Sequence, residues 1–522
     1  YVAAQSISVQ RYNNAQQFTT LEIESGTTVM FASAKYLYIG SSNNSSYRGV
    51  LSATGVTFTA LDTSAGWSGI WYQNYSDDGS SLIDSCIIEY ADDGIYCASA
   101  SPTITNSTIR SNTDGIYADS GSQPTITGNT FTGNERPVFI YADRIRSNIY
   151  GNTYSGNTKD YIEVQNATLD ENLTYVWSMD GAPYLISSDL EVRRDNNSSQ
   201  LSTLKIDSGA TVMFKNGIDL YIGHENNSNY RGALIANGVT FTAFDSTGWN
   251  GIRFRNYADD GSCLIDSSII EGADDGIYCE SSSPTITNSR IQNNVDGVYA
   301  DEGSSPILTG NTFSNNERPV TYYAHRIRTT NSENVFTSNT KDYIEVIAGD
   351  LTEHYGSVDY HWQDDGAPYV VTGTFRVWRN DQDGDNSQDR RSVLRIDSGT
   401  EIQFYPDQYL YIGHDPNSRF GALQADSVTF TAFDTSDAWG GLWYDNQAID
   451  DSTINYLKNS TVAYANYGIY CESASPTITN SRIQNNVDGV YADGGSQPVL
   501  IGNTFSNNSF GIKINKSDND YS

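Results

Sequence analysis

Basic residues are scarce in this 522-residue chain. Lysine and arginine number 30 against 63 aspartate and glutamate residues, which gives a formal net charge of −33 at pH 7. No basic patch is available to neutralise phosphates, so nucleic acid is excluded as a partner. The acidic excess favours solubility, cation binding or a salty environment, and a solvated acidic surface is the simplest explanation.

Long hydrophobic runs are absent as well. No stretch is long enough for a membrane span, and none has the pattern of a cleaved signal. The numbering starts at Tyr1 without a methionine, so we expect a mature, secreted protein of the cell surface. Frequent Asn-x-Ser/Thr sequons predict a glycoprotein, although a chain rich in Asn, Ser and Thr also produces chance matches. The candidate sites are Asn43, Asn44, Asn74, Asn106, Asn166, Asn172, Asn196, Asn197, Asn226, Asn459, Asn507 and Asn515.

Cysteine and histidine number five each, and no CxxC or zinc spacing occurs. Three cysteines share one motif, GIYC, where a small apolar side chain would fill a core: Cys97, Cys279 and Cys471. Cys86 and Cys263 each lie shortly before one of these. Two alternatives are open for a secreted chain: the disulfides Cys86–Cys97 and Cys263–Cys279, or buried free thiols.

Helix-forming residues dominate no long window, so we expect almost no helix. The stretch 92–134 instead repeats one short unit, GIY followed by TIT, at a period of about two dozen residues or a little less. Its isoleucines fit period 2 and not 3.6. We predict an all-β parallel β-solenoid in which Ile95 stacks on Ile116 and Asn106 stacks on Asn129.

A longer repeat runs through the whole chain. LEIESGTTVMF from Leu21 returns as LKIDSGATVMF from Leu204 and as LRIDSGTEIQF from Leu394, and each copy is followed by LYIG and VTFTA. We predict three tandem modules, 1–174, 175–359 and 360–522, the third truncated at its C-terminal end. The links between modules lack the Gly/Ser-rich or Pro-rich composition of a flexible linker, so the modules should form one continuous rod.

The recurring W-x-G-I, SPTITNSxI and GNTFSNN segments resemble the right-handed parallel β-helix proteins of the pectin-lyase-like superfamily, particularly repeat-rich secreted surface proteins of archaea and bacteria. The resemblance implies a right-handed β-helix. It says little about function, because that fold hosts lyases, hydrolases, adhesins and fibres.

An enzyme of this fold would use clustered aspartates or a basic residue, so both kinds were sought. Asp92-Asp93-Gly94 and Asp114-Gly115 look like such aspartate motifs, yet they recur in the later modules as a turn repeated for its geometry would. The nearest basic candidates are Arg144, Arg146, Arg326 and Arg328. We expect no catalytic residues and no enzyme activity, with a polysaccharide lyase or hydrolase as the alternative.

One loop of module three alternates carboxylates around a glycine, as calcium loops do. Its candidate ligands are Asp381, Asp383, Asp385 and Asp389. The loop lacks the glutamate that closes an EF-hand, so a solvated acidic loop is the other interpretation. Apart from Ca²⁺ at this loop, we expect no cofactor.

Aromatic residues cluster near the GWxGI turns and could stack on sugars or on one another: Tyr47, Trp71, Tyr72, Tyr75, Tyr230, Tyr257 and Tyr444. Trp67, Trp249 and Trp439 are assigned to packing. We hypothesise an extracellular structural rod whose open ends stack head-to-tail into a homopolymeric filament or sheath. The alternative is a secreted protein that binds or cleaves cell-surface polysaccharide.

Overall fold

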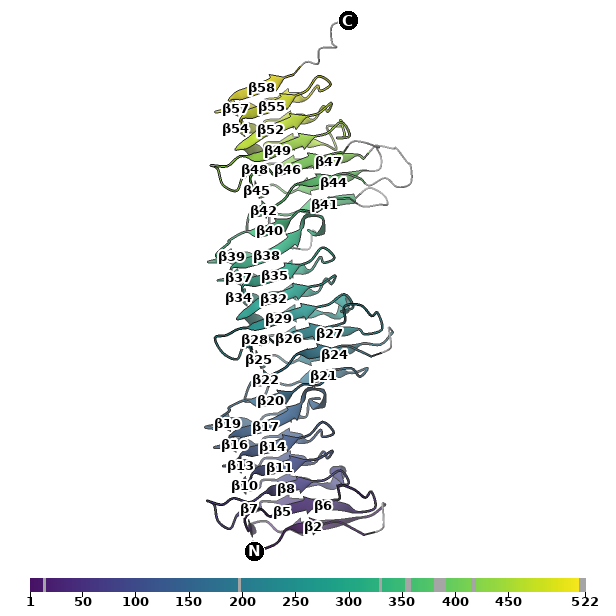
Figure 1. The fold of residues 1–522 in the computed structure, drawn as a ribbon, viewed down its shortest axis with the longest axis vertical. Coiled ribbons are helices and arrows are strands. Elements are labelled where there is room, and N and C mark those ends of the chain that lie inside the picture. Colours follow the sequence, from purple (N-terminus) through teal and green to yellow (C-terminus); the bar gives the residue numbers. More distant parts are fainter. Residues whose placement is uncertain are drawn as a thin grey trace. The chain divides into compact units, whose positions relative to one another are not determined.

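The structure is a computed structural model, shown in Figure 1, and it describes residues 1–12, 16–195, 199–327, 331–352, 358–379, 391–414 and 419–515. The chain forms two compact units, Tyr1–Asp274 and Asp275–Ser522. Each unit is a stack of coils, and most coils contribute three short strands. Every described pairing between strands is parallel, which confirms the predicted all-β solenoid.

The helices of the described residues are single 3-10 turns at coil corners. They are η1 (Asp78–Ser80), η2 (Ala142–Arg144), η3 (Asp260–Ser262) and η4 (Ala324–Arg326).

In unit one, the first strands of successive module-one coils pair into one sheet: β1 (Val2–Ala3), β4 (Thr28–Phe31), β7 (Thr57–Ala60), β10 (Ile87–Glu89), β13 (Thr108–Arg110), β16 (Thr130–Thr132) and β19 (Thr153–Ser155). The third strands form another: β3 (Phe18–Ile23), β6 (Arg48–Thr54), β9 (Leu82–Asp84), β12 (Thr103–Thr105), β15 (Thr125–Thr127) and β18 (Ile149–Tyr150).

The second strands of module one begin a longer sheet of unit one: β2 (Ile7–Val9), β5 (Tyr36–Ile39), β8 (Gly69–Tyr72), β11 (Asp93–Cys97), β14 (Asp114–Ala118), β17 (Arg136–Tyr141), β20 (Ile162–Gln165), β22 (Tyr184–Ile186), β25 (Thr211–Phe214), β28 (Thr240–Ala243) and β31 (Ile269–Glu271). Module two adds β23 (Leu190–Val192), β26 (Asp219–Ile222) and β29 (Trp249–Phe254) in one sheet. Another holds β21 (Thr174–Trp177), β24 (Ser202–Ile206), β27 (Gly232–Asn237) and β30 (Leu264–Asp266).

Unit two begins within β32 (Ala273–Cys279). Its longest sheet continues with β35 (Asp296–Ala300), β38 (Arg318–Tyr323), β40 (Ile344–Ile347), β42 (Tyr369–Val371), β45 (Glu401–Phe404), β48 (Thr429–Ala432), β51 (Thr461–Ala463), β54 (Arg482–Gln484) and β57 (Thr504–Ser506). Shorter runs of module two are β33 (Thr285–Thr287) with β36 (Ile307–Thr309), and β34 (Arg290–Gln292), β37 (Thr312–Ser314) and β39 (Val335–Thr337).

Module three supplies the other two sheets of unit two. Its second strands are β43 (Phe375–Val377), β46 (Tyr409–Ile412), β49 (Trp439–Tyr444), β52 (Ala465–Cys471), β55 (Asp488–Ala492) and β58 (Phe510–Ile514). Its third strands are β41 (Val358–Trp362), β44 (Ser392–Ile396), β47 (Gly421–Asp426), β50 (Tyr456–Lys458), β53 (Thr477–Thr479) and β56 (Val499–Ile501).

Aliphatic side chains stack from coil to coil in the core. Ile95 pairs with Ile116 and with Ile70, and all three are fully buried, which confirms the predicted isoleucine stack. Burying such a side chain is worth about 1.5–3 kcal/mol, so each coil is held mainly by its neighbours.

Asparagines form ladders at the buried corners, but in a different register from the predicted one. Asn129 is fully buried, and its Nδ2 donates to Asn152 Oδ1 at 3.1 Å. Asn106 instead lies exposed at φ 49°, and its Nδ2 donates to Asp84 Oδ1 at 2.8 Å. The predicted stacking of Asn106 on Asn129 is therefore wrong, because the left-handed backbone of Asn106 turns its side chain outward.

The Asp-Gly pairs are not left-handed corners either. Asp93 and Asp114 begin strands β11 and β14, and neither following glycine has a positive φ. Glycine is required at 115 because a Cβ there would lie 2.4 Å from the Pro137 carbonyl oxygen. Close packing between coils, not turn conformation, therefore explains this repeat.

The sheets shift by one strand position between modules. The sheet of second strands in module one continues from β20 into β22, the first strand of module two, with Ile162 opposite Tyr184. The same change occurs in unit two, where β40 pairs with β42 and Ile344 lies opposite Tyr369. The sheet formed by the second strands of one module is therefore continued by the first strands of the next module, and not by its second strands.

All five cysteines are buried free thiols. Cys86 and Cys97 lie in different parts of the coil. The Cys86 thiol donates to the Asp84 carbonyl oxygen at 3.2 Å, and Cys97 lies in β11 opposite Ala118. Neither Cys86–Cys97 nor Cys263–Cys279 forms a disulfide in this structure. It contains buried free thiols instead.

Candidate functional site

The repeated aspartates form an ion-pair ladder in module one. Asp93 lies opposite Asp114, and Asp114 lies opposite Arg136. Arg136 Nε and Nη2 donate to the two Asp114 oxygens at 2.7 and 2.6 Å. Burial, together with the neighbouring Asp114 carboxylate, raises the pKa of Asp93 to about 7. This ladder contains the groups that an acid–base catalyst would need.

Module two repeats the ladder with the same partners. Asp296 lies opposite Arg318, whose Nη2 donates to Asp296 Oδ2 at 2.6 Å and whose Nε donates to Oδ1. A constellation that recurs with unchanged geometry is explained by coil packing and does not single out one catalytic centre.

The basic candidates have local contacts. Arg144 Nε donates to the Ser120 carbonyl at 2.6 Å, and Arg146 pairs with Glu171 at 2.7 Å. Arg326 Nε donates to the Glu302 carbonyl. Arg328 lies outside the described residues. Arg144 and Arg146 also meet at Asp143, whose carboxylate and carbonyl oxygens they contact at 3.2 and 3.0 Å, whereas Arg326 binds a group of module two.

The proposed calcium ligands Asp381, Asp383, Asp385 and Asp389 lie outside the described residues. Within the described ranges, no group of three or more His, Cys, Asp and Glu side chains is arranged to hold a metal ion. The calcium loop stays a prediction.

The sequon asparagines that the structure describes are exposed, except Asn44, which is partly buried. Asn196 and Asn197 are outside the described residues. Asn106 and Asn459 already use their amides, which donate to Asp84 and Asp426 at 2.8 and 2.7 Å. Exposure makes most of these asparagines accessible, and glycosylation itself stays a prediction.

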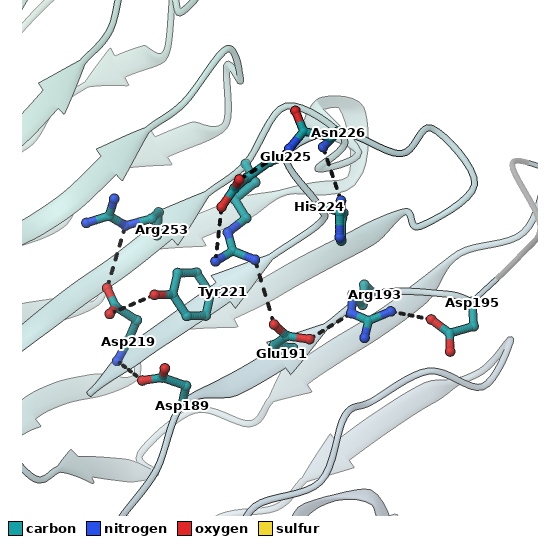
Figure 2. Close-up of polar contacts among 11 residues, drawn as sticks. Asp189, Glu191, Arg193, Asp195, Asp219, Tyr221, His224, Glu225, Asn226 and Arg253 are labelled. Carbon is teal, nitrogen blue, oxygen red and sulfur yellow. Dashed lines mark hydrogen bonds and ion pairs between the residues drawn. The ribbon is translucent and has the colours of Figure 1, made fainter. Parts of the chain in front are cut away.

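A charged network covers the second strands of module two, β23, β26 and β29 (Figure 2). At its centre, Asp219 is 4 % exposed. Its Oδ2 accepts hydrogen bonds from Tyr221 Oη at 3.0 Å and Asn250 Nδ2 at 2.7 Å, and its backbone N–H donates to Asp189 Oδ1 at 3.0 Å. Burial and the Asp219 hydrogen bond raise the pKa of Tyr221 to about 12.

Guanidinium groups surround this centre. Arg253 Nε lies 3.6 Å from Asp219 Oδ1. The Arg255 guanidinium stacks 3.5 Å from the centre of the Tyr221 ring and reaches Glu191 and Glu225 at 3.7 and 3.5 Å. Arg193 extends the network because it pairs with Glu191 at 2.7 Å and with Asp195 (Figure 2).

This network is confined to one module. In the matching repeat positions, module one has Tyr36 and Trp71 where module two has Asp219 and Arg253, and module three has Tyr409 and Trp443. Recurring segments could not predict this network, because its residues depart from the repeat. The comparison of GWSGIWYQN, GWNGIRFRN and AWGGLWYDN carried the signal, in the two arginines of the middle copy.

Partly exposed aromatic rings replace the charges in module one. The Tyr96 and Tyr117 rings stack with centroids 5.0 Å apart, buried Phe139 stacks on Tyr117 at 4.5 Å, and Trp71 meets Tyr96 edge-on at 4.9 Å. Of the aromatic residues proposed to stack on sugars, Trp71 belongs to this column, whereas Tyr72 and Tyr444 are fully buried. Rings at the spacing of the coils stabilise the stack and also present a flat outward surface.

The tryptophans assigned to packing are buried, as expected. Trp67, Trp249 and Trp439 stack on phenylalanines of the preceding coil, with centroids 4.2 to 4.4 Å apart.

Comparison with protein families matches the right handed beta helix region at residues 39–177, 222–353 and 424–521, which together exceed half of the chain. The chain belongs to this right-handed β-helix family. Comparisons with curated proteins and with solved structures gave no match.

Family membership leaves the activity of this β-helix protein open, because the family includes pectate lyase-like enzymes as well as non-enzymes. In the part of the chain that the structure describes, none of the helices has the length and hydropathy needed to cross a membrane. The function must therefore be inferred from the side chains of the candidate sites and not from the fold.

Proposed function

We propose that this β-helix protein is a non-enzymatic structural component of the cell surface. One observation carries the proposal: the acid–base ladder of Asp114 and Arg136 recurs as Asp296 and Arg318 with the same register and the same forked contact. Side chains that repeat to hold coils together are expected in a scaffold, whereas catalysis needs one distinctive constellation.

The test combines an assay for polysaccharide cleavage with antibody labelling of the protein on cells. Purified protein is incubated with neutral and uronate-containing polysaccharides, and the release of reducing ends and unsaturated products is measured. The proposal predicts no release, and it predicts that antibodies label the protein on intact cells of its source. Cleavage that is lost in a D114N variant, or labelling only after the cells are opened, would contradict it.

We further propose that copies stack head-to-tail. Core positions at the outermost described coils support this proposal: Ile7 lies opposite buried Leu37 yet is 38 % exposed, and Ile512 lies opposite buried Val490 yet is 50 % exposed. A further coil would cover such side chains, and a second copy can supply one. Electron microscopy at rising protein concentration should show filaments in the wild type and single particles in an I7K/I512K variant.

Polysaccharide binding is a second candidate, favoured by the charged network of module two, because modules one and three have aromatic residues at the positions of Asp219 and Arg253. Its guanidinium and carboxylate groups alternate across one sheet face, so it offers donors and acceptors to sugar hydroxyls or to acidic sugars. Affinity electrophoresis on a polysaccharide panel tests it. Retardation should weaken in R253A, and a matched R110A variant, which removes a partly exposed arginine of module one, should leave it unchanged.

A further inference from the structure

A pocket of about 420 Å³ opens on the second-strand face of module three. Its lining includes Tyr409 from β46, Tyr467 from β52, Asp488 from β55, and Phe510 and Lys513 from β58. Asn466 lies at its edge, with Nδ2 donating to Asp407 Oδ1 at 3.2 Å.

The pocket arises where the repeated ion-pair ladder is broken. Asp488 occupies the position of Asp114, and its strand partner is Phe510 where Asp114 has Arg136. The carboxylate on the preceding coil is also lost. In module one Asp93 lies opposite Asp114, whereas in module three Tyr467 lies opposite Asp488. Module three thus keeps the buried aspartate and replaces two of its charged neighbours with aromatic rings.

Asp488 is left incompletely satisfied. Its side chain is 4 % exposed, and Oδ2 accepts a hydrogen bond from Lys513 Nζ at 3.0 Å. Oδ1 is buried and has no hydrogen-bond partner among the described residues. A buried carboxylate oxygen without a donor is costly, so a ligand that donates to it would be bound favourably.

Ring faces form the apolar side of the pocket. The Tyr467 ring lies 5.6 Å from Tyr491, centroid to centroid, in an edge-on arrangement. Tyr409 can pack where it does because residue 440 is glycine, since a Cβ there would lie 2.5 Å from the Tyr409 ring. The Lys513 ammonium lies 5.2 Å from the Tyr491 ring centre, so the cation already has its own contacts.

We propose that this pocket binds one hydroxylated ring of a carbohydrate. The Asp488 carboxylate is already neutralised by Lys513, so the site suits an uncharged ligand better than a second cation. A sugar hydroxyl would donate to Asp488 Oδ1, the Lys513 ammonium and the Asn466 amide would donate to ring oxygens, and the C–H face of the sugar would lie on the tyrosines. This site is independent of the scaffold role and of the charged network in module two.

The test uses the full chain and methyl glycosides of glucose, galactose, mannose and N-acetylglucosamine, with binding followed by saturation-transfer NMR and calorimetry. The decisive variant is Phe510→Arg, which restores the guanidinium of modules one and two. It should weaken binding at least about tenfold and leave the melting temperature equal or higher, because a forked ion pair replaces an open pocket. A melting temperature at or above that of the wild type shows that loss of binding in this variant does not come from unfolding.

Two further variants separate the site from its repeats. D488N should weaken binding about tenfold, since a charged acceptor is lost. D114N in module one should lower stability and leave glycoside binding unchanged. The proposal is overturned if none of the glycosides binds, if Phe510→Arg binds them as the wild type does, or if arginine binds the pocket and the glycosides do not.

Discussion

Asp93 and Asp114 are directly opposed on neighbouring parallel strands, and Arg136 binds only the second of them. Two partly buried carboxyl groups are therefore placed against each other at the start of β11 and β14, beside one forked cation. Burial and this opposition raise the pKa of Asp93 to about 7, against 3.8 without them. The arrangement makes the stability of this coil depend on pH.

Between about pH 4 and pH 7 the folded chain holds a proton on Asp93 that the unfolded chain has lost. The stabilising effect is therefore complete below pH 4 and disappears as the pH rises through 7. Substituting Asp93→Asn should raise stability at pH 8 by about 1–3 kcal/mol, after allowance for solvent screening, and have little effect at pH 4. Urea unfolding across pH 4–8 measures this, with exposed Glu24→Gln as the control. A parallel pH dependence in D93N and wild type would refute it.

The asparagine ladder should be sensitive to one truncation. Asn134 Oδ1 accepts from the Asn112 side chain at 3.0 Å, and its Nδ2 donates to Asn157 Oδ1 and to the Ile109 carbonyl. N134A leaves buried groups on both adjacent coils unsatisfied, so we expect a loss of about 2–4 kcal/mol. Denaturant unfolding gives the value, and exposed Asn74→Ala should change it by less than about 0.5 kcal/mol.

Gly115 sets the distance between two coils. A Cβ at this position would lie 2.4 Å from the Pro137 carbonyl oxygen, whereas at Gly79 nothing lies within 4 Å. G115A should therefore lower the melting temperature by several degrees through a forced backbone shift, with a cost of roughly 2–3 kcal/mol. G79A is the matched control and should melt like the wild type. Equal melting of G115A and wild type would show that the coils separate freely.

The five thiols should be unreactive until the chain unfolds. Burial raises the pKa of the Cys97 thiol well above its ordinary value and that of Cys263 to about 12, so little thiolate forms at pH 8. A thiol reagent should count close to zero groups in the native protein and five in denaturant without a reductant. A count of three or one in denaturant would mean that one or both of the disulfides Cys86–Cys97 and Cys263–Cys279 exist.

The acidic loop of module three should bind calcium if its alternating carboxylates act as ligands. Calorimetric titration should then show heat, and Ca²⁺ should raise the melting temperature. A D383N/D385N variant should lose both effects, because two carboxylate ligands are removed. No heat and no shift with the wild type would identify the loop as a solvated acidic segment.

The coil and its isoleucine stack were predictable because they depend on local, repeated information. GIY occurs on two successive coils of module one, side chains alternate along a strand, and identical motifs pair in register, so Ile95 over Ile116 follows from spacing. The predicted asparagine pair was in the wrong register. Asn106 follows the TIT motif directly and Asn129 lies one residue further along, so strand pairing places Asn106 beside Gly128 and Ser107 beside Asn129.

The candidate sites needed the tertiary structure. Glu191, Asp219 and Arg253 are about 30 residues apart in succession, and coiling places them on three adjacent strands of one sheet. Asp488 and Phe510 are likewise separated by one coil and meet only through strand register. The sequence alone determined the parallel β-solenoid, since periodicity and repeats specify the coil. Only the tertiary structure decided which departures from the repeat meet, because that depends on register between coils.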